Sequence, residues 1–415
     1  MSYMIAGIDV HKRVLMVAVA DASLSPDDME FHCRQFGTTE KELQHLAAWL
    51  QQCGAREAVM ESTAQYWRPV WLALEGLFTL YLAQAWSNRA PKGRKTDFKD
   101  AQRLVRRHAV RELTLSFVPE AQQRQVRTLT RRRVQLVHDR VRLQNQLEAL
   151  LEEMSIKLSS LVTDLFGVSA RRILTALSQG VSDPEALAEL GDARLQCTRE
   201  QLRDALPGPI PELSRQLLVL LLEQLTLLDR QIERLFQLAA SAMQEWQAAI
   251  GRLMEIPGIQ MLAAQQIVAE AGPDAAAFPS AAQFTSWIGL CPGTNESAGE
   301  NHSSRCPKGN RYLRRSLCQA AQAAARTKNS RFQALFRRLL PRLGFAKAIW
   351  AVARHVAIVV WLVLHNAVRY QERGGLSTPQ AIKRRTQYLL KSLREAGYTV
   401  EIRSPLTAPS VQSGA

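Results

Sequence analysis

The apolar pattern of this chain changes its period at about residue 119, and this change most limits the folds that the chain can adopt. Before that point, short apolar runs of strand length alternate with amphipathic segments, one of which predicts a helix at about 40–53. The runs that predict strands are 3–10, 14–20, 30–36, 57–62 and 77–84. Three early strands followed by strand, helix, strand and helix predict a mixed sheet covered by helices.

After residue 119 the pattern is typical of long helices. The segment from about 119 to 160 has an apolar seam at spacings of 4, 3 and 4, formed by Leu143, Leu147, Leu150 and Met154. A second seam holds heptad a and d positions at Leu218, Leu221, Leu225, Leu228, Ile232 and Leu235. Two long helices with apolar seams predict either an antiparallel hairpin within one chain or a coiled coil between chains, and periodicity leaves both open.

A third, mostly helical region runs from 249 to about 370 and begins with IPGIQ. It ends in a very apolar segment at 345–367, but the uninterrupted apolar run, 356–364, is far shorter than the roughly 20 residues of a membrane span. We therefore predict a buried helix there and no membrane contact. Beyond 373 we expect a charged helix and then a polar, disordered tail.

The charge of the chain indicates a polyanionic partner. There are 53 Lys and Arg against 38 Asp and Glu, a formal net charge of +15. The first half of the 119–160 helix is especially basic, with few aromatic residues nearby, which favours charge-driven contact with a duplex or a folded RNA over base stacking. The six cysteines form no CxxC pair, so we expect buried thiols in a reducing compartment and no zinc site.

Four acidic residues have positions that suit a divalent metal. Asp9 ends the first predicted strand and Glu61 a later one, while Asp97 and Asp100 lie one helical turn apart in KTDFKDA. Carboxylates at the rim of a sheet can converge on Mg²⁺ or Mn²⁺, which can clamp a scissile phosphate. Each residue alone is better explained by turn formation or helix capping than by a metal. The four together, beside the basic loop around Lys92, favour the metal.

Several motifs in order give the chain a resemblance to a known family. GIDVHK, the glutamate of AVMES and the TDxxDA after a basic loop come first, and IPGI, FPSAAQFTSWIGLCPGTNES and KGNRYLRRSLCQAA follow. This set resembles the RuvC-like transposases of insertion-sequence family one hundred and ten and its relatives numbered eleven-eleven. The resemblance covers nearly the whole chain. It implies an RNase H-like (RuvC-like) first domain whose metal ligands are Asp9, Glu61, Asp97 and Asp100.

The resemblance also implies a nucleophilic serine in the C-terminal domain. The family's serine follows its GLxP motif and normally precedes a glycine, which carries over to Ser297. Here Ala298 stands between that serine and Gly299, so Ser303 and Ser304 are the alternatives. The implied reaction is strand cleavage and rejoining through a phosphoserine. The implied partners are donor and target DNA, a non-coding bridge RNA and further copies of the chain, in a tetramer built as a dimer of dimers.

Basic residues near these motifs are the expected nucleic-acid contacts. The helix that opens after KGN begins with several cations that could hold the attacked phosphate. IPGIQ resembles the hairpin of a helix-hairpin-helix element, which grips the sugar-phosphate backbone, although Gln260 replaces the usual second glycine. The predicted contacts are Lys12, Arg94, Lys95, Arg131, Arg132, Arg133, Lys308, Asn310, Arg311, Arg314 and Arg315.

These observations predict four segments and leave three functions in competition. The segments are a RuvC-like domain at 1–115, a helical and partly coiled-coil segment at 116–248, a helical transposase domain at 249–372 and the charged tail at 373–415. The leading function is a cytoplasmic DNA transposase. A hydrolytic RuvC-like nuclease, of the junction-resolvase type, would activate water and leave Ser297 incidental. A non-enzymatic nucleic-acid scaffold would use its acidic residues only as helix caps.

Overall fold

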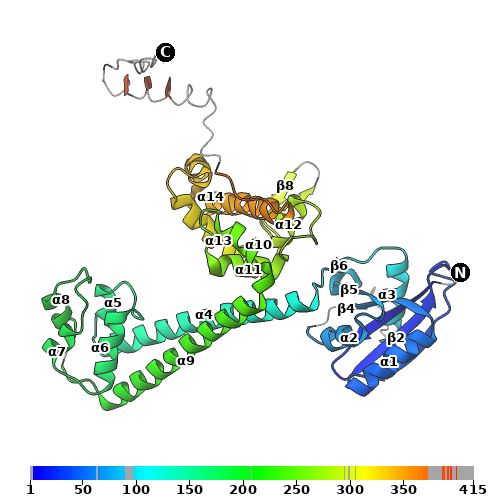
Figure 1. Ribbon diagram of the computed structural model, residues 1–415, viewed down its shortest axis with the longest axis horizontal. Helices are drawn as coiled ribbons and strands as arrows, with labels where there is room; N and C mark the ends of the chain where they lie inside the picture. The colour runs from blue at the N-terminus through cyan, green and yellow to red at the C-terminus, as the bar shows by residue number, and fades with distance from the viewer. Residues whose placement is uncertain are drawn as a thin grey trace, which may run out of the picture. The chain divides into compact units, whose positions relative to one another are not determined.

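The computed structural model describes residues 3–61, 64–88, 97–206, 208–293, 295–297, 300–303 and 305–372, and only a few single positions beyond these (Figure 1). The chain divides into two compact units, Met1–Glu120 and Ala121–Ala415, and each is described by itself. The tail predicted beyond residue 373 lies outside the described residues apart from those single positions, and so do Arg94, Lys95 and Ser304.

The first unit contains a six-stranded mixed sheet. Its strands are β1 (Met4–Val10), β2 (Val14–Asp21), β3 (His32–Gly37), β4 (Ala55–Glu61), β5 (Thr79–Ala83) and β6 (Leu115–Ser116), in the order β3-β2-β1-β4-β5-β6. β1, β2 and β3 are antiparallel neighbours, whereas β1, β4 and β5 run parallel. The predicted mixed sheet is therefore confirmed, and only the two-residue β6 was not predicted.

Helices cover both faces of this sheet. Alternate residues of β1, such as Ile8, join α1 (Glu40–Gln52) and α2 (Trp67–Leu74) in one hydrophobic core. The other face packs on α3 (Asp97–Ala109), where Ile5 lies against Val105. A short 3-10 helix, η1 (Ala85–Asn88), follows β5. Because strand side chains alternate between faces, each strand contributes residues to both layers.

Two long helices form the frame of the second unit. α4 (Ala121–Glu153) and α9 (Glu212–Ala242) pack side by side and antiparallel (Figure 1). The direction follows from two hydrogen bonds: Gln122 Nε2 donates to the Ala242 carbonyl over 3.3 Å, and Arg140 Nε donates to Asp229 Oδ1 over 2.8 Å. The predicted seams are buried or half-buried between these helices. Of the two alternatives, the structure shows the hairpin within one chain.

Four short helices close the end of this pair. They are α5 (Leu158–Leu161), α6 (Val168–Ser178), α7 (Pro184–Glu189) and α8 (Arg199–Asp204). Leu174, Leu187 and Leu202 extend the core formed by the long helices. Asp183 and Thr198 cap α7 and α8, each accepting a backbone hydrogen bond, so the starts of these two helices are locally encoded.

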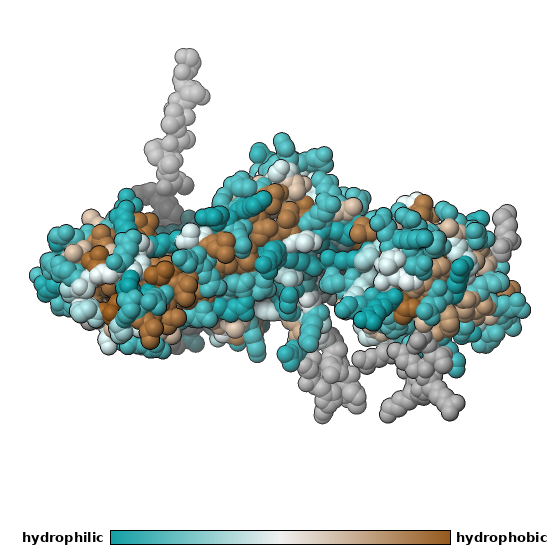
Figure 2. Space-filling model, turned by 90° about the horizontal axis from the view of Figure 1, so that it is seen from below, coloured by the Kyte–Doolittle hydropathy of each residue, from teal (hydrophilic) through white to brown (hydrophobic). Residues whose placement is uncertain are grey.

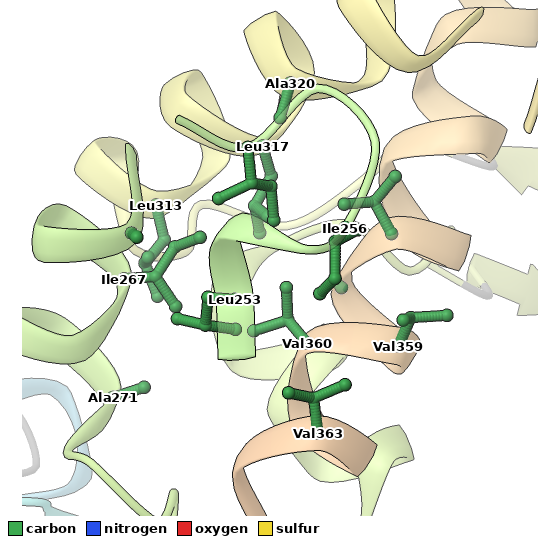
Figure 3. Close-up of a cluster of buried hydrophobic side chains, with 14 of the residues drawn as sticks. Leu253, Ile256, Ile267, Ala271, Leu313, Leu317, Ala320, Val359, Val360 and Val363 are labelled. Carbon is green, nitrogen blue, oxygen red and sulfur yellow. The ribbon is translucent and has the colours of Figure 1, made fainter. Parts of the chain in front are cut away.

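The remaining helices enclose a second core (Figure 3). They are η2 (Gln244–Trp246), α10 (Gln247–Met254), α11 (Met261–Ala271), α12 (Ala281–Ile288), α13 (Arg311–Arg326) and α14 (Arg331–His365). Figure 3 shows Leu253 and Ile256 between Leu317 of α13 and Val360 of α14. Two short strands that were not predicted, β7 (Asn295–Ser297) and β8 (Glu300–Ser303), form a hairpin before α13.

The second half of α14 is the apolar helix predicted at 345–367, and a first half that begins at Arg331 precedes it. α14 is interrupted at Gly344, whose φ and ψ are 71° and 171°, and Pro341 precedes the break. Its length and composition would suffice to cross a membrane, but 56% of its most apolar window is buried within the protein. Val352, Val356 and Val360 lie in the core, as expected for a buried helix.

Two features of the surface correct or extend the sequence analysis. The cysteines are free, as expected, but Cys33 is exposed and the other five are half-buried, so the prediction of buried thiols was wrong. Figure 2 shows hydrophobic side chains gathered in patches over the helical part of a mostly hydrophilic surface. α9 has exposed leucines at positions 213, 217, 220 and 227.

Candidate active site

The ends of two neighbouring parallel strands bring two of the predicted carboxylates together. The register pairs Ile8 of β1 with Met60 of β4, so Asp9 and Glu61 are the next residues on each strand. Ile8 and Met60 both face the core under α1 and α2, and the alternation of strand side chains therefore turns Asp9 and Glu61 toward the other face. That is the face covered by α3.

A third carboxylate reaches this face from α3. Asp100 is 5% exposed and precedes Ala101, whose carbonyl oxygen would lie only 2.2 Å from a Cβ at Gly7. Only a residue without a side chain at position 7 permits this approach of α3 to β1. The glycine of GIDVHK thus brings the start of α3 next to β1, the strand that carries Asp9.

Each of these carboxylates has a polar neighbour. Asp9 Oδ2 lies 3.1 Å from His11 Nε2, Asp100 pairs with Arg103, and Glu61 Oε2 accepts a hydrogen bond from Asn88 Nδ2 over 3.0 Å. α3 begins at Asp97, whose side chain is not described. Among the described residues, no three or more His, Cys, Asp or Glu side chains are grouped closely enough to hold a metal. The fold therefore brings Asp9, Glu61 and Asp100 to one edge of the sheet, where each carboxylate interacts with a neighbouring side chain.

Asn88 is a site residue that the sequence analysis missed. Its side chain is 2% exposed, and its Oδ1 accepts no hydrogen bond within the part of the chain that the structure describes. Arg103 Nε donates to the Asn88 carbonyl over 3.0 Å, and Arg107 donates to the Ser87 carbonyl, so η1 is fixed to α3. A buried amide oxygen without a donor, beside carboxylates, fits the oxygen-rich ligand sets of Mg²⁺ and Mn²⁺.

A sequence signal for Asn88 was present. LAQAWSN follows the run that forms β5, and β5 is parallel to β4. Because the carboxyl ends of parallel strands meet at one edge of a sheet, polar residues just after β5 belong to the same edge as Asp9 and Glu61.

The predicted nucleophile lies in the second unit. Ser297 is the last residue of β7 and pairs with Glu300 of β8, so its backbone belongs to a hairpin. The base of the hairpin is held by Gly293 N–H donating to the Arg305 carbonyl over 3.3 Å. Asn310 N–H donates to the Trp287 carbonyl over 3.1 Å, which ties the following loop to the end of α12. The side chains of Ser297 and Ser303 are not described.

Several of the predicted nucleic-acid contacts have exposed side chains: Lys12, Arg132, Lys308, Arg311 and Arg315. Arg314 is half-buried, with its guanidinium 5.9 Å from the ring centre of Trp350. Arg311 lies 4.9 Å from the ring centre of Tyr312. The basic start of α13 is thus partly solvent-facing and partly held against aromatic rings.

Arg131 and Asn310 instead belong to a buried network. Glu270 of α11 is fully buried, and Arg131 Nε and Nη2 each donate to its carboxylate over 2.7 Å. Asn310 Nδ2 donates to Glu270 Oε2 over 2.8 Å, while its Oδ1 caps α13 by accepting the N–H groups of Tyr312 and Leu313. These two residues join α4, α11 and α13.

Burial and the Glu270 carboxylate shift the pKa values of two arginines in this network, Arg127 and Arg131. Burial lowers the pKa of Arg127 to about 10, although the charge of Glu270 opposes this. Burial also acts to lower the pKa of Arg131, but its hydrogen bonds with Glu270 and the charge of that carboxylate outweigh it, and the pKa is raised. The ion pair with Glu270 therefore stabilises the charged form of Arg131 at this partly buried position.

Arg133 is likewise an interior residue. It is 5% exposed, and its guanidinium donates to Gln265 Oε1 over 2.8 Å and to the Leu262 carbonyl over 3.2 Å. In contrast, Arg132 on the next position of α4 is exposed. The basic row predicted from sequence is therefore divided between the interior and the surface of the unit.

Comparisons with known proteins identify the family. A model of DEDD transposases of the IS110 type matches residues 6–156, and the model described as "Transposase IS116/IS110/IS902 family" matches 251–337. Together the two matches span more than half of the chain. The first match implies a RuvC-like fold for the first unit, and such domains typically use a divalent metal.

Two relatives agree with this assignment. A "Probable family 20 transposase" of Pseudomonas aeruginosa is 28% identical over 286 residues, which are 68% of this chain and 75% of the relative. An "Insertion element IS110 uncharacterized 43.6 kDa protein" of Streptomyces coelicolor is 29% identical over 128 residues, 29% of this chain and 30% of that protein. The chain therefore belongs to the IS116/IS110/IS902 family of insertion-sequence transposases.

Proposed function

We propose that this transposase cuts and rejoins DNA through a covalent phosphoserine formed at Ser297. In the cleavage step the Ser297 oxygen bonds to the phosphorus, the bond from phosphorus to the leaving sugar oxygen breaks, and that oxygen takes the proton. Attack by the hydroxyl of another DNA end reverses these changes and restores the serine, so no external energy is needed for rejoining. Family membership supports cleavage and rejoining of DNA.

Asp9, Glu61, Asp97 and Asp100 would hold a divalent cation, Mg²⁺ or Mn²⁺. The observation on which this proposal rests is that Asp9 and Glu61 lie near the ends of adjacent parallel strands, on the face that α3 and Asp100 cover. The cation would supply positive charge that stabilises the phosphate during the exchange. The protein's own contribution is orientation, because Asn88 holds the Glu61 carboxylate through its amide N–H.

The nucleic-acid partners follow from the charge and from the resemblance. We infer donor and target DNA as substrates, with a bridge RNA as guide. The exposed cations Lys12, Arg132, Lys308, Arg311 and Arg315 contact phosphates, and Arg94 and Lys95 are assigned to the same role. Arg131, Arg133 and Asn310 act by fixing the helices that present these cations.

We also propose that the chain works as an oligomer, with one copy supplying the carboxylates and another supplying Ser297. The exposed leucines of α9 at positions 213, 217, 220 and 227 support this, since their spacings of 4, 3 and 7 define a second apolar face, distinct from the buried seam. A tetramer acting on DNA in the cytoplasm is the arrangement that the family resemblance implies.

The direct test looks for the covalent intermediate. Labelled donor and target DNA are incubated with the protein, Mg²⁺ and the RNA transcribed from the element's end, and the reaction is quenched in denaturant. We expect label on the protein with the wild type and none with Ser297→Ala or Asp9→Ala. Strand cleavage without label, unchanged in Ser297→Ala, would identify a hydrolytic nuclease instead. Binding without cleavage at any divalent ion would identify a scaffold.

A further inference from the structure

A cavity of about 320 Å³ lies in the second unit between α4, the turn that precedes α11, and α13. Its volume falls at the lower end of the range found for small-molecule sites, about 300–1,000 Å³. Val137, Leu262 and Ala320 give it largely apolar walls. Figure 3 shows Leu317 and Ala320 of α13 packed over the turn that contains Ile256, so this wall is part of the core. Such walls suit a compact ring better than a bare ion.

One lining residue has an unused hydrogen-bond acceptor. Gln266 is 3% exposed, and its Nε2 lies 3.3 Å from Glu270 Oε1, to which it donates. The reverse orientation of the amide would place two acceptors against each other, so Oε1 is the atom left over. This Oε1 accepts no hydrogen bond from any described residue. A buried acceptor without a donor is costly, and a ligand with an N–H group would satisfy it.

The cavity is also positively charged. Arg133 lines it and is bonded only to the neutral groups of Gln265 and Leu262, and no carboxylate among the described residues pairs with it. Burial lowers the pKa of Arg133 to about 10, which leaves it protonated at neutral pH. Arg315 of α13 lines the same cavity and is exposed to solvent. The charge favours a ligand that includes an anion.

We propose that this cavity binds one unpaired nucleotide, with its base inside and its phosphate at Arg315. The proposal rests on the proposed nucleic-acid function and adds to it a site of defined chemistry. Gln266 turns its buried Oε1 toward the cavity to accept an N–H group on the Watson–Crick edge of the base, and the apolar walls contact the faces of the ring. Every nucleobase has an N–H on its Watson–Crick edge, so the site accepts any base. The base must be unpaired, because base pairing engages that edge. A bulged or single-stranded nucleotide meets this requirement at the lowest cost.

The test measures binding of the full-length protein to 2-aminopurine oligonucleotides without divalent metal. One duplex contains 2-aminopurine as a single bulged nucleotide, and the matched duplex has it paired. DNA and RNA versions of both reveal which nucleic acid supplies the nucleotide. Gln266→Leu removes the acceptor at similar size, and Ala263→Phe fills the cavity from a half-buried lining position. Gln322→Leu, at an exposed position of α13 outside the cavity, is the matched control.

We expect the wild type to bind the bulged duplex about tenfold more tightly than the paired one, with a fluorescence change only for the bulge. Gln266→Leu reduces the preference about fivefold, as the loss of one hydrogen bond predicts. Ala263→Phe abolishes the preference, and Gln322→Leu keeps it. Equal binding of both duplexes by the wild type, or an unchanged preference in Gln266→Leu and Ala263→Phe, overturns the proposal. Because no cleavage is measured, failure of the transposase mechanism leaves this result intact, and the reverse also holds.

Discussion

The carbonyl oxygen of Ala101 lies 2.2 Å from the position that a Cβ on Gly7 would occupy. The absence of a side chain at position 7 therefore allows β1 and α3 to approach closely, and this approach sets the separation of Asp9 from Asp100. The GIDVHK motif thus has two parts with different roles. Its glycine permits the close packing of α3 on β1, and its aspartate, Asp9, lies on the face of the sheet that α3 and Asp100 cover.

Gly7→Ala tests that relationship. The added methyl group must displace α3, which we expect to cost about 1–3 kcal/mol of unfolding free energy and to lower strand cleavage more than stability alone explains. Gly251→Ala is the control, because a Cβ at this position of α10 meets nothing within 4 Å. It should stabilise by up to about 1 kcal/mol. Chemical denaturation followed by cleavage assays on the folded fraction measures both. Full activity in Gly7→Ala would contradict the packing argument.

Arg131 and Arg132 form a natural pair for separating structural from nucleic-acid roles. Arg131→Ala leaves the buried Glu270 carboxylate without its bidentate partner, which should cost about 3–5 kcal/mol of stability. Arg132→Ala removes an exposed side chain, and stability should change by no more than about 0.5 kcal/mol. DNA affinity at low salt should fall in Arg132→Ala, with a weaker salt dependence. Equal stability of the two variants would refute this division.

Asn88→Ala examines whether the orphan amide oxygen belongs to the metal site. The variant loses both the hydrogen bond to Glu61 and the unused Oδ1. We expect the Mg²⁺ concentration for half-maximal cleavage to rise at least about tenfold, as for other residues that orient metal ligands. Ser87→Ala, which changes the neighbouring residue of η1, should leave that concentration unaltered. An unshifted Mg²⁺ titration in Asn88→Ala would exclude the residue from the site.

The exposed leucines of α9 predict a change in assembly. Leu220 is 59% exposed, so Leu220→Glu should fold normally but weaken association between copies. Thr226→Glu introduces the same charge at an exposed position on a different face of α9 and should assemble as the wild type does. Light scattering over a range of protein concentrations reports the mass. If Leu220→Glu retains the wild-type mass at every concentration, the leucine face is not the interface.

The order of elements could be predicted from the sequence because its local signals agree with the fold. Short apolar runs of strand length marked β1, β2 and β4, and the seams at Leu143 and Leu225 marked α4 and α9. β6 and the β7-β8 hairpin were missed because strands of two to four residues are too short to show a period.

The candidate site was harder to predict, since it depends on partners distant in sequence. A basic helix has the same residues whether its arginines face solvent or a buried carboxylate. Only the fold shows that Glu270, 139 positions away, pairs with Arg131. Asn88 was not predicted as a site residue for the same reason, because its position near Glu61 depends on the register that places β5 beside β4.

The most direct test of the account compares two carboxylates on the same face of β4. Glu61 lies at the proposed catalytic edge, whereas Glu57 lies four residues earlier, roughly 13 Å away by strand rise, where it pairs with Tyr3 and His108. The rate of DNA strand cleavage in Mg²⁺ should fall about a hundredfold or more in Glu61→Gln. It should be unchanged in Glu57→Gln, whose amide oxygen can still accept from Tyr3 while its amide N–H donates to the His108 ring. Equal rates in the two variants would contradict the assignment of the catalytic edge.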